Sequence, residues 1–77
     1  MAYEEDVLEE KTGTATVFAR QGGTVNLRSS PSLQAIVRIR VPLGEKVEVL
    51  EETNEEWARV QYGRYTGYMM REFLAPD

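Results

Sequence analysis

The chain has 77 residues, carries 13 acidic and nine basic side chains for a net charge of −4, and contains neither cysteine nor histidine. This length limits it to one small domain, and the missing residue types exclude disulfides, zinc-finger ligand sets and Cys–His or Ser–His catalytic pairs. No apolar run approaches the roughly 20 residues that span a bilayer, and neither a metal site nor a cofactor is expected.

The first thirteen residues, MAYEEDVLEEKTG, form an acidic leader that accounts for the whole net charge. Five acids and one lysine give it −4, whereas residues 14–77 hold eight acids and eight bases. A basic field for nucleic acid is therefore absent, and an acidic start without an apolar core is not expected to be a signal peptide. Because Tyr3, Val7 and Leu8 have helical spacing, the leader is either a solvated linker or a short helix that docks on a neighbour.

From Thr14 onward the sequence consists of short alternating segments, rich in β-branched and aromatic residues and separated by turn residues. This pattern predicts a small all-β barrel or sandwich as a single domain over residues 14–77. The predicted strands are 14–19, 24–27, 36–41, 45–51, 56–62 and 65–70, followed by a 3₁₀ turn at 71–73 and a last strand residue at Leu74. The predicted core consists of Val17, Val25, Leu27, Val37, Ile39, Val41, Val47, Val49, Ala58, Val60, Met69 and Leu74.

The clearest local signal is the segment QYGRYTGY at residues 61–68. Glycine in the first position of the two-residue turn Gly63-Arg64 predicts a type II′ hairpin, which fixes the register of its two strands. One face then holds the pairs Tyr62–Tyr65, Val60–Gly67 and Ala58–Met69, and the other holds Gln61–Thr66, Arg59–Tyr68 and Trp57–Met70.

The second of these faces is expected to meet water, although it carries a tryptophan, a tyrosine and a methionine. Large apolar groups gathered on an exterior often mark a binding surface. This expectation depends on an outward-facing, accessible indole at Trp57, and an indole covered by its neighbours would remove the proposed contact surface.

Three segments, TVNLRSSPS, LGEKVEVLEE and EWARVQYGRYTGYMMREFL, resemble the bacterial SH3-like (SH3b) domain family in order and spacing. The resemblance runs from about Thr14 to Leu74 and implies a small, strongly bent, partly open barrel of five to six strands. It also implies that the Arg-Ser-Ser-Pro segment begins a long loop that borders a ligand groove.

The resemblance places the ligand-binding residues along this groove. Its wall is expected to hold Trp57, Tyr68, Met70 and Phe73, while Arg28 and Arg59 supply hydrogen bonds. The Ala-Leu-Tyr-Asp-Tyr stretch of the eukaryotic relatives is replaced by VNLRS, and Met70 replaces their groove proline, which argues against recognition of proline-rich peptides.

Each of these residues also has a structural interpretation. Arg28 is either a ligand contact or a brace that donates hydrogen bonds to loop carbonyls, and the brace is favoured. Trp57 is either a stacking platform or a packing residue, and Arg59 with Tyr68 is either a ligand contact or a cation–π pair. The segment EETNEE is favoured as a solvated loop over a Ca²⁺ site or a glycosidase dyad, and RQGG is favoured as a turn.

The resemblance implies a non-enzymatic binding module in the cell envelope or outside the cell. As in other members of that family, it would attach a parent protein to cell-wall peptide or glycan. The alternative is a structural or assembly module that packs against a protein partner in a multiprotein or phage complex, with the acidic leader docking on a neighbour. Nucleophile–base pairs that would support an enzymatic function are missing.

Overall fold

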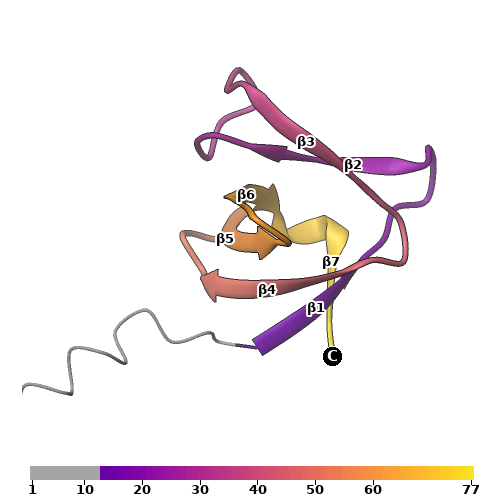
Figure 1. Cartoon of the computed structure of the whole chain (residues 1–77). Coiled ribbons are helices and arrows are strands. Elements are labelled where there is room, and N and C mark those ends of the chain that lie inside the picture. The colour runs from indigo at the N-terminus through magenta and orange to yellow at the C-terminus, as the bar shows by residue number, and fades with distance from the viewer. Residues whose placement is uncertain (1–12) are drawn as a thin grey trace, which may run out of the picture.

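The computed structural model describes residues 13–77 as seven strands joined by short turns (Figure 1). The acidic leader, for which a linker or a docking helix was expected, lies outside the described residues except for Gly13. Within residues 13–77, no helix is long and apolar enough to cross a membrane. The strands are β1 (Gly13–Val17), β2 (Thr24–Arg28), β3 (Val37–Pro42), β4 (Lys46–Glu51), β5 (Trp57–Tyr62), β6 (Tyr65–Met70) and β7 (Leu74–Pro76).

All seven strands belong to one antiparallel sheet in the order β3-β2-β6-β5-β4-β1-β7. The sheet bends strongly on itself (Figure 1), while β3 and β7 remain its two edges. The predicted all-β, partly open SH3-like barrel is therefore confirmed. A seventh strand is present because Leu74–Pro76, beyond the 3₁₀ turn Arg71–Phe73, pairs with β1.

The β5–β6 hairpin has the predicted register at all six pairs, from Tyr62–Tyr65 beside the turn to Trp57–Met70 at the open end. Gly63 has a φ of +61°, and no residue other than glycine in the described chain has a positive φ. A positive φ at the first turn position alone is the signature of a type II′ turn. The two-residue turn therefore determines which side chains share a face of the hairpin.

The core lies inside the bend of the sheet and contains eight of the twelve predicted residues. Ile39, Val49 and Leu74 are partly buried against it, and Ala15 belongs to it although it was not predicted. Val37 was wrongly placed there and is 36% exposed. The β2–β3 register shifts between Leu27 and Arg28, so Val37 is paired with Arg28 and not with a core residue, whereas Ile39 is paired with the buried Leu27. The core cluster is Ala15, Val17, Val25, Leu27, Val41, Val47, Ala58, Val60 and Met69.

Candidate functional site

A groove of about 280 Å³ brings together four of the six predicted site residues, Arg28, Trp57, Met70 and Phe73. They come from β2, the start of β5, the end of β6 and the 3₁₀ turn, which are far apart in the sequence. We call this hollow the Trp57 groove. Its full lining is Ala19, Gln21, Thr24, Val25, Asn26, Arg28, Leu33, Trp57, Met70 and Phe73.

Trp57 lines this groove but is not the exposed platform that was expected. Its side chain lies on the face of β5 opposite Ala58 and outside the core cluster, as the register requires, yet the residue is only 5% exposed. The hairpin register determines the face on which a side chain lies but not what covers that face. Here residues of the β1–β2 connection, of β2 and of the loop at Leu33 line the same groove as Trp57. The expectation of an accessible indole face was therefore wrong, and the exposed contact surface that depended on it is absent. Trp57 instead contributes to the lining of the groove.

Asn54 holds the start of β5, and the sequence interpretation missed it. Its Oδ1 accepts hydrogen bonds from the backbone N–H groups of Glu56 at 2.8 Å and Trp57 at 2.9 Å. Its own N–H donates to the Trp57 carbonyl at 3.1 Å. An asparagine two or three residues before a strand is the typical residue of such a turn, so the signal lay within EETNEE. Asn54 thus positions the backbone that carries the indole.

Arg28 lies in the groove as a brace, in agreement with the favoured interpretation. Its Nη1 donates to the carbonyl oxygens of Leu33 at 2.9 Å and Ala35 at 3.0 Å. These bonds tie the loop of residues 29–36 back onto the end of β2. Arg28 therefore shapes one wall of the groove by holding the loop in place.

The two remaining predicted site residues, Arg59 and Tyr68, are half-buried cross-strand partners and do not line the groove. Arg59 Nε lies 3.5 Å from Glu51 Oε1, and Tyr68 is also the residue through which β6 pairs with Arg28 of β2. Glu52 similarly pairs with Arg71 at 3.7 Å. Two glutamates of EETNEE are thus engaged with arginines, and residues 13–77 contain no group of three or more metal-ligating side chains.

A second hollow of about 570 Å³ continues the Trp57 groove past Phe73. The two hollows share the lining residues Ala19, Gln21 and Phe73. The other lining residues of the second hollow are Phe18, Arg20 and Glu72. Phe18 is 44% exposed. The second hollow therefore offers an accessible aromatic ring together with the cation Arg20 and the anion Glu72. The sequence interpretation selected none of these three residues, because only the tertiary structure brings the β1–β2 connection next to the 3₁₀ turn.

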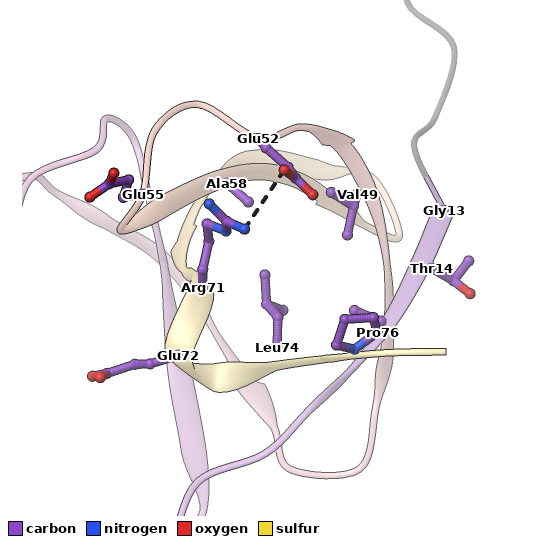
Figure 2. Close-up of a pocket in the computed structure, with 11 residues that line it drawn as sticks. Gly13, Thr14, Val49, Glu52, Glu55, Ala58, Arg71, Glu72, Leu74 and Pro76 are labelled. Atoms are coloured by element: carbon purple, nitrogen blue, oxygen red, sulfur yellow. Dashed lines mark ion pairs between the residues drawn. The ribbon is translucent and has the colours of Figure 1, made fainter.

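A third hollow, of about 420 Å³, opens at the end of the barrel near Gly13 and contains none of the predicted site residues. Figure 2 shows Val49 and Leu74 pointing into it from opposite sides. The ion pair between Glu52 and Arg71 spans its rim, and Arg71 Nη1 also donates to the Asn54 carbonyl at 2.9 Å. Because Arg71, the one cation among the described residues of its lining, is already engaged with Glu52 and Asn54, and because no predicted site residue lines it, this hollow is the weaker candidate for a ligand site.

The sequence profile of the bacterial SH3 domain matches residues 23–75, and the chain therefore belongs to the bacterial SH3 domain family. This family typically provides non-catalytic binding modules. No curated protein matches the chain significantly.

Two solved structures from Trichomonas vaginalis are similar in fold. NlpC2 superposes with a TM-score of 0.73 at 22% identity, covering 84% of this chain and 23% of NlpC2. NlpC1 superposes with a TM-score of 0.70 at 22% identity, covering 80% of this chain and 21% of NlpC1. The chain thus spans less than a quarter of each of these proteins, and the similarity concerns the SH3-like fold.

Proposed function

We propose that this domain attaches a parent protein to bacterial cell-wall peptide or glycan through the Trp57 groove, without catalysing a reaction. The observation that carries the proposal is the convergence of Trp57, Met70 and Phe73 in one groove. Apolar and aromatic walls with a few polar groups at the rim are typical of sites that bind small or extended ligands.

The polar groups of the groove suit a ligand that carries amides or hydroxyls. Among residues 13–77, the side-chain amides of Gln21 and Asn26 make no hydrogen bond to other groups of the protein and line the groove. An amide both donates and accepts, so these two residues can pair with a peptide backbone or with sugar hydroxyls. The aromatic walls supply contact area.

The continuation of the groove past Phe73 favours an elongated ligand over a compact one. Arg20 and Glu72 stand there beside the exposed ring of Phe18 and have no ion pair in the described part of the chain. A cell-wall peptide that carries both carboxylate and ammonium groups would meet a matching charge at this end. Association with the cell wall follows from the same proposal and places the domain in the envelope or outside the cell.

The first prediction tests the groove by retention on purified peptidoglycan. Met70→Glu places a charge in the groove without touching the core cluster, and we expect the bound fraction to fall at least about tenfold, as for a residue at the centre of a contact. The matched control is Tyr65→Glu on the same strand, because Tyr65 is 39% exposed and lies outside the groove. Circular dichroism of both variants establishes that they are folded.

Two outcomes would contradict the proposal. Equal retention of wild type and Met70→Glu would show that the groove is not the contact, and no retention of the wild type would reject wall attachment. Repeating the assay on peptidoglycan from which an amidase has removed the peptides separates the two ligand classes, because only glycan binding survives this treatment.

A further inference from the structure

The most exposed aliphatic side chains of the described chain gather at one place, the loop before β3 and the first residue of that strand. Leu33 is 65% exposed, Ile36 is 75% exposed and Val37 is 36% exposed. Arg38 and Arg40 follow on β3 and are exposed as well. We call these five residues the β3 patch. Contiguous exposed apolar groups beside charged ones are typical of protein interaction sites.

Hydrogen bonds inside the loop hold the aliphatic side chains in these positions. The N–H of Ser29 donates to the Ile36 carbonyl at 2.8 Å, and the N–H of Ala35 donates to the Ser32 carbonyl at 3.1 Å. The two bonds from Arg28 fix the Leu33 and Ala35 carbonyls from the other side. The loop is thus tied down with its aliphatic groups outward, and a surface ordered before binding loses little entropy when a partner docks.

The strand that carries the patch has an unpaired edge. β3 is the terminal strand of the sheet and pairs only with β2. Within residues 13–77, neither Arg38 nor Arg40 has an ion pair or a hydrogen bond from its side chain. The patch therefore offers apolar area, two uncompensated positive charges and free backbone groups, which suit an acidic partner with aliphatic side chains.

The chain itself contains an acidic segment that also carries apolar side chains. Residues 1–12 combine a charge of −4 with Tyr3, Val7 and Leu8. They precede β1, which lies beside the edge strand β7, whereas β3 is the opposite edge of the sheet (Figure 1). We propose that the β3 patch binds the acidic leader of a second copy of the chain. Reciprocal exchange of leaders gives a closed two-fold dimer in which each leader covers the other copy's patch.

The second prediction tests this exchange by sedimentation of the full chain. We expect wild type to dimerise, and Arg38→Glu/Arg40→Glu to raise the dimer dissociation constant at least about tenfold, because attraction becomes repulsion. Ile36→Ser is expected to weaken the dimer without changing its charge. A control, Arg20→Glu/Arg64→Glu, makes the same change in net charge away from the patch and is expected to leave the dimer intact.

The decisive experiment exchanges the charges of the leader and the β3 patch. Glu5→Lys/Glu9→Lys in the leader is expected to weaken the dimer alone and to restore it in combination with Arg38→Glu/Arg40→Glu. A wild type that stays monomeric at millimolar concentration would overturn the proposal, as would a dimer that responds equally to the patch and control variants. The patch shares Leu33 with the Trp57 groove but does not include Met70. Met70→Glu is therefore expected to leave the dimer unchanged, so a failure of the groove proposal can be told from a failure of this one.

Discussion

Gly67 of β6 lies close against the backbone of β2 at Arg28. A Cβ built at this position would overlap the carbonyl oxygen of Arg28 and would lie 3.1 Å from Leu27 Cγ. The carbonyl belongs to the backbone of β2 and cannot turn aside as a flexible side chain would. Glycine is therefore required here, because the two strands approach closely. The hairpin register predicted the partner of Gly67 on β5, Val60, but gave no sign of this contact with β2.

The third prediction concerns Gly67→Ala. We expect it to lower the free energy of unfolding by about 1–3 kcal/mol, since an added methyl in a closely packed site forces the backbone to shift. Urea denaturation followed by tryptophan fluorescence measures this change. Gly23→Ala is the matched control, because its Cβ would meet nothing within 4 Å. Equal midpoints for the two variants would show that the approach of β2 to β6 is looser than described.

At the scale of an element, the loop of residues 29–36 decides the form of both proposed surfaces. Leu33 borders the Trp57 groove and belongs to the β3 patch, and Arg28 holds its carbonyl at 2.9 Å. One side chain thus supports a ligand wall on one side and an exposed apolar surface on the other.

The fourth prediction removes this support with Arg28→Met, which keeps the apolar stem and deletes the donors. Two carbonyls lose a charged donor, and we expect a loss of about 1–3 kcal/mol in unfolding free energy. Hydrogen exchange of the Ser29 and Ala35 amides is expected to accelerate, while the amides of the β5–β6 hairpin keep their rates. Unchanged loop exchange combined with loss of ligand binding would instead identify Arg28 as a direct ligand contact.

At the scale of the whole molecule, Asp77 joins three strands at one edge of the sheet. Its carboxylate accepts hydrogen bonds from Thr14 Oγ1 at 3.1 Å, Thr16 Oγ1 at 3.0 Å and Lys46 Nζ at 2.9 Å. Thr14 and Thr16 belong to β1, Lys46 belongs to β4, and Asp77 directly follows β7. The bonds from Lys46 and Thr16 are the main causes that hold the pKa of Asp77 below its ordinary value.

The fifth prediction follows from the sign of this shift. A carboxyl whose pKa is lower in the folded state stabilises the fold above its unfolded pKa of about 4, and this contribution disappears as the pH falls through the folded pKa. Wild type is therefore expected to be more stable than Asp77→Asn at pH 7, and the difference is expected to shrink below about pH 4. Thermal unfolding of both proteins from pH 7 to pH 2.5 measures it. A difference independent of pH would show that the ionised carboxylate is not responsible.

Local patterns in the chain were sufficient to predict much of this fold. The alternation of apolar residues predicted the six main strands, and Gly63-Arg64 predicted the hairpin register through Trp57 and Met70. The short strand β7 was harder to predict, since three residues carry almost no periodic signal and its partner β1 lies some sixty residues earlier.

For the candidate site, too, some features follow from local sequence and others only from the tertiary structure. The sequence by itself determined which side chains share a face, because a side-chain period of two and a two-residue turn are local properties. Only the tertiary structure decided that Trp57 is covered, that Gln21 and Phe18 join Phe73, and that Val37 stays exposed at a sheet edge. Burial depends on which distant segment lies over a face, and that is a property of the whole packed chain.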